Sequence, residues 1–430
     1  MRIATHTLGC KLNFAETSHL QRSFEQAGFN IVGFHEKADV YVVNSCTVTS
    51  VAEKKCRNAI RQAVSQNPEA TVAVIGCFAQ NEAERIAQIP GVDIILGNEQ
   101  KHRLLEILTS GTFHPAGGPL INTDEPRSFQ LSYSKGDRTR TFFKIQDGCD
   151  YFCSYCAIPF ARGRSRSASI AETVATAREI AAGGAREIVL TGVNTGTFGQ
   201  QRGERFINLL KALDDIEAVA RYRISSIEPN LLTDEIIDFV AHSRAFLPHF
   251  HIPLQAGSDK VLKAMHRHYD TALYAGRIEH IRQVMPDACI AADVITGFNC
   301  EDDETFAQSK DFIRSLPISY LHVFPYSDRP HTAALKMGEK TPIPVRRARA
   351  CELRELSEAK RRHFVESQLD KCRTVLWEHT RHLDGGKPTM QGWTDNYIRL
   401  QRPYSATLAG TVTPYLITPS SIVHNFSCDD

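Results

Sequence analysis

The sequence has no long hydrophobic run and almost no net charge. The run Val72-Ala73-Val74-Ile75 is typical of its longest apolar stretches, far short of the roughly 18 residues of a membrane span, so we expect no membrane partner. Fifty basic residues against 49 acidic ones leave a net charge of +1. Overall charge therefore predicts no polyanion partner, and any nucleic-acid site must come from local clustering. The start, Met1-Arg2-Ile3, has no basic and apolar export leader, so we expect a soluble, cytoplasmic protein.

Cysteine is abundant instead, with twelve in 430 residues. A disulfide framework is not expected in a large chain without a leader, because the cytoplasm keeps thiols reduced. In such a compartment, many cysteines indicate metal ligands or catalytic thiols, with the remainder packed as small apolar residues.

The hydrophobic pattern predicts an α/β protein with three domains. Residues 1–112 alternate β-branched runs with amphipathic helical stretches, which is typical of a doubly wound parallel α/β domain. In its first helix, Asn13 and Glu16 have the spacing of a capping box and Gly28 marks the end. Residues 113–138, rich in Pro and Gly, are predicted to be a linker.

The second and third domains are predicted over residues 139–369 and 370–430. Six strand-like runs begin the second domain's repeating units, at residues 142–145, 187–190, 222–225, 250–252, 290–295 and 320–324. With helices between them they predict a partial (β/α)6 barrel, with its chemistry at the carboxyl ends of the strands. A charged helix over about 345–371 follows, and the tail has the short strands of a small β-barrel.

Three cysteines follow the first predicted barrel strand within one short loop. They are Cys149, Cys153 and Cys156, in the spacing C-x3-C-x2-C. Three thiolates on such a loop can hold three irons of a 4Fe-4S cube and leave the fourth iron open. Zinc is the alternative, although a closed zinc site needs four ligands and no second pair lies nearby.

Three more cysteines follow strands of the first domain. Cys10, Cys46 and Cys77 come after its first three predicted strands, and in a doubly wound sheet those ends share one edge. We therefore predict a second three-thiolate cluster there. The other six show no common pattern and are assigned no role; they are Cys56, Cys289, Cys300, Cys351, Cys372 and Cys428.

The C-x3-C-x2-C loop after the first barrel strand resembles the radical S-adenosylmethionine (SAM) superfamily. This resemblance implies that the open iron chelates SAM and that one electron cleaves SAM to a 5′-deoxyadenosyl radical. It also implies SAM contacts near the third cysteine and at successive strand ends: Tyr155, Thr191, Gly192, Asn194, Ser225, Glu228, Gln255 and Asp293. Each could instead cap a helix or form a turn.

The whole chain resembles the methylthiotransferases, most closely the MtaB type. The segments that carry this resemblance are 7–13 (TLGCKLN), 146–156 (QDGCDYFCSYC), 159–167 (PFARGRSRS), 251–258 (HIPLQAGS) and 322–327 (HVFPYS). The MtaB type converts C2–H to C2–SCH3 on N6-threonylcarbamoyladenosine beside the tRNA anticodon. The resemblance implies two 4Fe-4S clusters, one SAM as methyl donor and one as radical source. It also implies a small redox protein as electron donor and a sulfur donor system.

Two other functions stay open at this point. The same chemistry could act on isopentenyladenosine in tRNA or on a ribosomal-protein aspartate. A non-catalytic RNA-binding protein with structural zinc is the alternative from another class. The family's Gly-Phe-Pro-Gly-Glu after the fifth strand is here Gly297-Phe298-Asn299-Cys300-Glu301, and we expect a retained but reshaped loop, in which Asn299 can adopt the turn conformation.

Local basic clusters are the candidates for gripping the anticodon stem-loop. Arg162, Arg164 and Arg166 directly follow the loop of Cys149, Cys153 and Cys156 and could hold phosphate. Arg361 and Arg362 lie in the charged helix, where a solvated face with i,i+4 ion pairs is the alternative. The tail resembles a TRAM domain, a small RNA-binding barrel, but some of its aromatic residues must form its core.

Overall fold

The structure is a computed structural model that describes residues 1–110, 118–135, 139–384 and 386–423. It divides into two compact units. Unit 1 comprises Met1–Asp137, Phe142–Ala168 and Ser327–Leu335, and unit 2 comprises Arg138–Thr141, Ser169–Tyr326 and Lys336–Asp430. Residues 112, 113 and 138, where we expected domain boundaries, and Cys428 lie outside the described residues.

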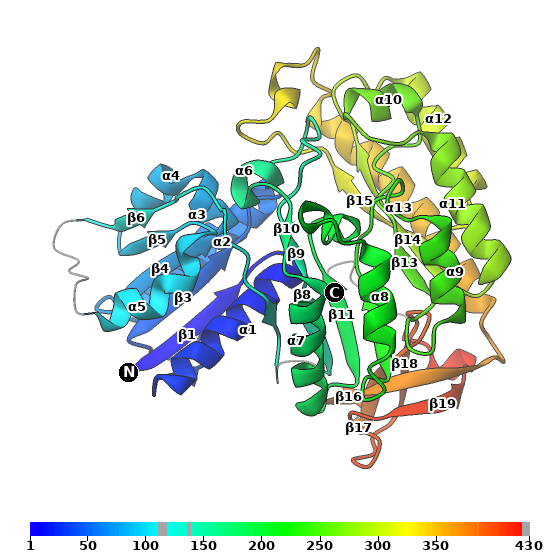
Figure 1. Cartoon of the computed structure of the whole chain (residues 1–430). Coiled ribbons are helices and arrows are strands. Elements are labelled where there is room, and N and C mark those ends of the chain that lie inside the picture. Colours follow the sequence, from blue (N-terminus) through cyan, green and yellow to red (C-terminus); the bar gives the residue numbers. More distant parts are fainter. Residues whose placement is uncertain (111–117, 136–138, 385, 424–430) are drawn as a thin grey trace. The chain divides into compact units, whose positions relative to one another are not determined.

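A six-stranded parallel sheet forms the centre of unit 1 (Figure 1), in the order β2-β1-β3-β4-β5-β6. Its strands are β1 (Arg2–Thr7), β2 (Asn30–Val32), β3 (Val40–Ser45), β4 (Thr71–Gly76), β5 (Ile94–Leu96) and β6 (Leu120–Asn122). The helices between them are α1 (Lys11–Gln26), α2 (Ser50–Gln66), α3 (Cys77–Asn81), α4 (Ala83–Ala87) and α5 (Leu104–Thr109). The expected doubly wound α/β domain is confirmed.

Helices cover both faces of this sheet, as its apolar strands require. Phe24 of α1 packs with Val42 on one face, whereas Ile60 of α2 packs with Tyr41 and Val43 on the other. The three consecutive β3 residues therefore alternate between the two faces, as in any pleated strand.

Two expectations for the N-terminal region were wrong in detail. Helix α1 begins at Lys11 with Cys10 as its N-cap, so Asn13 and Glu16 lie inside the helix, where they are buried, and form no capping box. Part of the expected linker is strand: β6 extends the parallel sheet, and β7 (Ser132–Tyr133) pairs antiparallel with β8 (Arg140–Lys144). Main-chain pairing thus orders segments whose Pro and Gly content indicated a linker. The rest of unit 1 includes β9 (Gln146–Asp147), α6 (Ile158–Arg162) and β10 (Arg166–Ser167).

Unit 2 contains five parallel strands of the expected barrel. They are β11 (Glu187–Thr191), β12 (Arg221–Ile224), β13 (His249–His251), β14 (Cys289–Thr296) and β15 (Tyr320–Pro325). β11 pairs with β12, and β13, β14 and β15 form one sheet. Single parallel bridges, Tyr222 to Phe246 and Ser226 to His251, connect these two groups of strands. The intervening helices are α7 (Ile170–Ala182), α8 (Phe206–Asp214), α9 (Asp234–His242), α10 (Asp259–Ala264), α11 (Thr271–Val284) and α12 (Asp303–Ser315).

The charged helix and the tail complete unit 2. Helix α13 covers Ile343–Glu366, and four antiparallel strands follow it in the order β18-β17-β16-β19. These strands are β16 (Cys372–Asp384), β17 (Lys387–Thr394), β18 (Arg399–Pro403) and β19 (Val412–Leu416). They form a curled half-barrel rather than a closed barrel, with Trp377 and Met390 in its core. In the described part of the chain, no helix combines the length and apolar character needed to cross a bilayer.

Candidate iron-sulfur and cofactor sites

The first cysteine group lies where three adjacent strands of unit 1 end. Cys10 follows β1 and begins α1, Cys46 directly follows β3, and Cys77 directly follows β4 and begins α3. Because β1, β3 and β4 are parallel neighbours, these positions share the carboxyl edge of the sheet. Cys56 lies instead on α2 in the apolar core.

The turn before Cys10 packs directly against Cys46. Gly9 has φ +101°, and a Cβ atom placed on it would lie 2.7 Å from Cys46 Cβ and 2.8 Å from Cys46 Sγ. Burial raises the pKa of the Cys46 thiol to about 12, and the neighbouring Cys77 and Cys10 thiols contribute to the rise. Cys46 and Cys77 are buried and Cys10 is exposed. A buried thiol becomes a thiolate only with compensating positive charge, which a metal centre supplies.

Arg162 brings a buried positive charge to the same thiols. Its side chain is 1% exposed. Burial alone would lower its pKa, but Asp147, Cys77, Glu16 and Cys10, in that order, raise the pKa of Arg162 well above its usual value. The guanidinium therefore stays charged and favours thiolates in the first cysteine group.

The second cysteine group lies on the loop between β9 and α6, also in unit 1. Cys153 is buried, whereas Cys149 and Cys156 are half-buried. The Cys149 amide donates a 3.1 Å hydrogen bond to the Gly163 carbonyl oxygen, and the Cys156 amide donates one of 3.0 Å to the Cys153 carbonyl oxygen. Gly148, at φ +71°, has no room for a side chain, because a Cβ would lie 2.0 Å from the Arg164 carbonyl oxygen. Tyr155, half-buried, directly precedes Cys156.

A buried charge network lies beside both cysteine groups. Glu16 accepts from Lys101 Nζ at 2.6 Å and Lys144 Nζ at 2.9 Å, while Asp147 accepts from Arg162 Nη1 at 2.9 Å. All five side chains are at most 4% exposed. Sequence reasoning missed this network; the only local signal was Lys144 between the apolar residues Phe143 and Ile145.

The burial of two arginines contradicts their expected contact with RNA. Arg162 belongs to the network just described, and Arg166 Nε donates a 2.6 Å hydrogen bond to the Ser128 carbonyl oxygen and is 9% exposed. Both arginines lie near the buried carboxylate of Asp147, and Arg166 also donates hydrogen bonds to main-chain carbonyl oxygens of unit 1. Arg164 is exposed and lies over the Phe152 ring, so its contact with RNA stays a prediction.

The expected SAM contacts of unit 2 lie at or just after the ends of their strands. Thr191 ends β11 and is buried, as is Asn194 shortly after it, with Gly192 between them. Ser225 directly follows β12, is 5% exposed, and its Oγ has no hydrogen-bond partner among the described residues. An unsatisfied buried hydroxyl at a strand end fits a site that a polar ligand completes.

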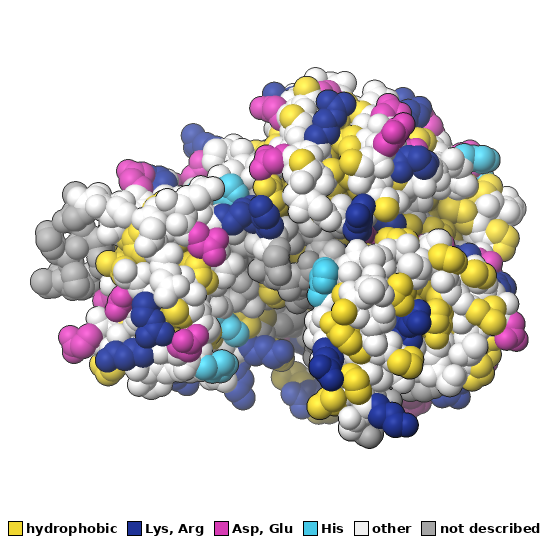
Figure 2. All heavy atoms as spheres, turned by 90° about the horizontal axis from the view of Figure 1, so that it is seen from below, with side chains coloured by type: hydrophobic (Ala, Val, Ile, Leu, Met, Phe, Trp, Pro, Cys, Tyr) yellow, Lys and Arg dark blue, Asp and Glu magenta, His cyan; other side chains and the backbone are white. Residues whose placement is uncertain are grey.

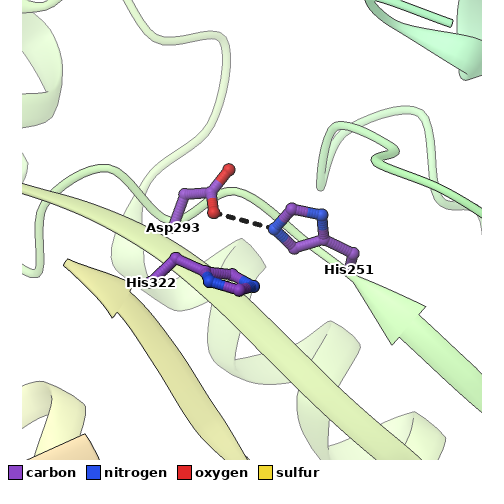
Figure 3. A group of neighbouring side chains, drawn as sticks. All are labelled: His251, Asp293 and His322. Atoms are coloured by element: carbon purple, nitrogen blue, oxygen red, sulfur yellow. Dashed lines mark hydrogen bonds and ion pairs between the residues drawn. The ribbon is translucent and has the colours of Figure 1, made fainter. Parts of the chain in front are cut away.

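Three further candidates are held by charged or main-chain contacts. Glu228 forms an ion pair with Arg267; burial raises its pKa, Arg267 opposes the rise and the Asp293 carboxylate adds to it. Gln255, at φ +66°, continues the main-chain pairing with β14, since its amide donates a 2.8 Å hydrogen bond to the Asp293 carbonyl oxygen. Asp293 Oδ1 accepts a 2.8 Å hydrogen bond from His251 Nε2, and His322 lies beside the pair (Figure 3).

The loop after β14 differs from our expectation. Cys300, not Asn299, adopts the left-handed conformation, with φ +82°. Asn299 is buried and donates from Nδ2 to the Met337 carbonyl oxygen at 3.2 Å. Glu301 accepts from the Gly297 amide at 2.6 Å and from Arg349 at 2.8 Å. The loop thus keeps the hydrogen bond between Gly297 and Glu301, although Cys300 adopts a strained main-chain conformation.

The two arginines of α13 that we expected to bind RNA differ in their surroundings. The Arg361 charge lies near the half-buried Tyr320 and the buried Cys289, whereas Arg362 is exposed. Trp377 and Trp393 are at most 3% exposed and form core. On the face in Figure 2, both basic and acidic side chains are present.

Comparison with known proteins agrees with this arrangement. The Radical SAM superfamily matches residues 143–313, and the Uncharacterized protein family UPF0004 matches residues 2–97. The radical SAM methyltransferase TsrM from Kitasatospora setae, solved with cobalamin and a [4Fe-4S] cluster, has a similar fold, with a TM-score of 0.55 at 14% identity over 77% of this chain and 76% of that one. The fold and the cysteine loop thus define a radical SAM enzyme, a class that uses a 4Fe-4S cluster and SAM.

Two curated relatives narrow this class. "Threonylcarbamoyladenosine tRNA methylthiotransferase MtaB" of Bacillus subtilis is 36% identical over 98% of this chain and 95% of its own length. "tRNA-2-methylthio-N(6)-dimethylallyladenosine synthase" of Syntrophotalea carbinolica is 30% identical over 89% of each chain. The chain belongs to the radical SAM tRNA methylthiotransferases, and within that family to the MtaB type.

Proposed function

We propose that the protein methylthiolates C2 of N6-threonylcarbamoyladenosine beside the anticodon of tRNA. The observation that carries this proposal is the pair of three-cysteine groups in unit 1, beside one buried charge network. The choice of substrate follows the higher identity to the MtaB relative, 36% against 30% for the relative named for dimethylallyladenosine.

The residues fit two clusters better than two single ions. Among the described residues, neither cysteine trio has its sulfur atoms all within 4.8 Å of one another, whereas the sulfurs of one zinc ion lie about 4 Å apart because Zn–S bonds are about 2.3 Å. A cube separates its thiolates further, since each binds a different iron. Cys149, Cys153 and Cys156 would hold the SAM-binding cluster, and Cys10, Cys46 and Cys77 the second one.

When bound, the clusters and SAM would supply one-electron chemistry to break a C–H bond that no general base can deprotonate. One SAM would serve as methyl donor and a second one as radical source. The chain's own residues hold and orient these groups. Arg162 stabilises thiolates beside the first cysteine group, and the hydroxyl of Ser225 offers a hydrogen bond to a polar ligand. Tyr155, Thr191, Gly192, Asn194, Glu228 and Gln255 stay predicted SAM contacts. The reaction also needs a small redox protein and a sulfur donor.

The test compares two cysteines of the same unit. In a strain without the native gene, we expect wild-type protein and Cys56→Ser to restore the methylthio derivative of threonylcarbamoyladenosine in tRNA, measured by mass spectrometry of nucleosides. Cys77→Ser should not restore it and should hold about four irons instead of about eight. A methylthio-isopentenyladenosine product would contradict the substrate, and bound zinc without SAM cleavage would contradict the enzyme class.

A further inference from the structure

Three potential metal ligands meet on neighbouring barrel strands of unit 2 (Figure 3). His251 ends β13, Asp293 lies in β14, and His322 lies directly opposite Asp293 in β15. One ligand atom from each lies within 4.8 Å of the others. Among the described residues, no other such group of three His, Cys, Asp or Glu side chains is present.

The strand register explains why these side chains converge. Asp293 and His322 are cross-strand partners, and His251 pairs with Ala291, two residues before Asp293. Residues two apart on a strand share one face, so all three side chains project from the same face of the β13-β14-β15 sheet. They are partly shielded, because the His251 and Asp293 side chains are 16% and 22% exposed.

Ser226 fixes the orientation of the His251 ring. Its Oγ lies 2.8 Å from His251 Nδ1, and the opposite ring nitrogen, Nε2, lies 2.8 Å from Asp293 Oδ1. A hydrogen bond to the far nitrogen is the usual means by which proteins orient a metal-binding histidine. Two ligand atoms 2.8 Å apart also match adjacent positions around one ion, for which bonds of about 2.1 Å give about 3 Å.

We propose that His251, Asp293 and His322 bind one divalent first-row transition-metal ion. Two imidazoles and one carboxylate are a donor set that such ions prefer and that leaves coordination positions open. Ligands on opposite sides of an ion with bonds of about 2.1 Å are about 4.2 Å apart. The three ligand atoms lie within 4.8 Å of one another, so binding one ion needs a contraction of less than about 1 Å. A rotation of the His322 ring can provide it.

This site goes beyond the proposed function and does not depend on it. Nitrogen and oxygen ligands in unit 2 are chemically separate from the cysteine groups of unit 1, and metal binding here requires neither SAM nor tRNA. The site gives Asp293 the role of a metal ligand instead of the SAM contact that we expected from the sequence.

The surface of unit 2 provides a matched control. His280 Nε2 lies 2.8 Å from Asp238 Oδ1, the same contact as between His251 and Asp293, but no third ligand joins the pair among the described residues. If a histidine-carboxylate pair alone bound metal, both places would bind it. The inference therefore depends on His322.

The experiment titrates Mn²⁺ into the full-length protein with reconstituted clusters and without SAM, and follows free Mn²⁺ by electron paramagnetic resonance. Mn²⁺ is chosen because it favours nitrogen and oxygen ligands over thiolates. We expect one saturable site in the wild type and in His280→Ala. Asp293→Asn and His322→Phe should weaken binding at least about tenfold, and so should Ser226→Ala, by the loss of ring orientation.

His322→Phe keeps a ring of similar size against Tyr320, whose ring centre lies 5.2 Å from that of His322. Unchanged circular dichroism and iron content in this variant would separate loss of a ligand from misfolding. The proposal is overturned if the wild type shows no saturable Mn²⁺ binding, if His322→Phe binds like the wild type, or if His280→Ala loses as much affinity as His322→Phe.

Discussion

Arg162 donates a 2.6 Å hydrogen bond from Nη2 to Oδ1 of Asn13, and both side chains are 1% exposed. Asn13 lies three residues after Cys10, and Arg162 lies six residues after Cys156. One buried bond therefore connects the surroundings of the two cysteine groups. The same guanidinium also contacts Asp147, two residues before Cys149, at 2.9 Å.

Replacing Arg162 should destabilise unit 1 strongly. In Arg162→Met, the Glu16 and Asp147 carboxylates stay buried but lose this partner, and breaking a buried ion pair costs about 3–5 kcal/mol. Arg162→Lys keeps the positive charge but loses the bidentate geometry of the guanidinium. Its stability should therefore lie between that of the wild type and that of Arg162→Met. Thermal melting checks this, with Arg164→Met as the control, since the exposed Arg164 side chain should change stability by less than about 0.5 kcal/mol. Equal melting temperatures for Arg162→Met and Arg164→Met would contradict the role of Arg162.

A side chain at Gly9 should prevent assembly of the cluster on Cys10, Cys46 and Cys77. In Gly9→Ala, the new Cβ would lie 2.8 Å from Cys46 Sγ, at a φ that non-glycine residues avoid. Gly28→Ala has a similarly positive φ of +84° but nothing within 4 Å, so it tests backbone strain alone. Iron analysis after anaerobic reconstitution should give about four irons per chain for Gly9→Ala and about eight for Gly28→Ala. Eight irons in both would show that crowding at Cys46 does not matter.

The sequence predicted the elements of this fold better than the environment of its charged residues. The runs that become β11 to β15 are marked by β-branched and aromatic residues, which need no distant partner to favour a strand. The cysteine positions followed from chain order, because parallel strands end at one edge.

Burial of charge could not be predicted in the same way. Arg162 lies in a segment with the composition of a surface loop. Its burial depends on Asp147 and on two residues far away in the sequence, Asn13 and Glu16. The same holds for His251, Asp293 and His322, whose convergence depends on strand register rather than on a local pattern.

Acid should weaken unit 1 through Glu16. Burial alone would raise its pKa, but Arg162, Lys101 and Lys144 hold the pKa of Glu16 well below its usual range. The unfolded chain then takes up a proton near pH 4.5 while the folded chain does not. This contribution to stability is therefore complete above about pH 5 and is lost as pH falls further, by up to about 1.4 kcal/mol per pH unit.

Melting temperatures measured between pH 6 and about pH 3.5 check this dependence. Glu16→Gln should lower stability at neutral pH and flatten the acid slope, because it removes the titrating group. Glu106→Gln is the control: the pKa of Glu106 is also lowered, by Arg103, but that pair lies at the surface. An acid slope that Glu16→Gln leaves unchanged would contradict the assignment.

Cys300 is a position where a substitution should stabilise the protein. This exposed residue has φ +82°, a conformation that costs a residue with a Cβ about 1 kcal/mol and costs glycine little. Cys300→Gly should therefore raise the stability of unit 2 by roughly that amount, less the entropy that glycine adds to the unfolded chain. Cys351→Gly, at an exposed cysteine in the interior of α13, should instead lower stability by about 1 kcal/mol. Differential scanning calorimetry should show melting shifts of opposite sign for the two variants, and a destabilised Cys300→Gly would show that the cysteine side chain itself holds the loop.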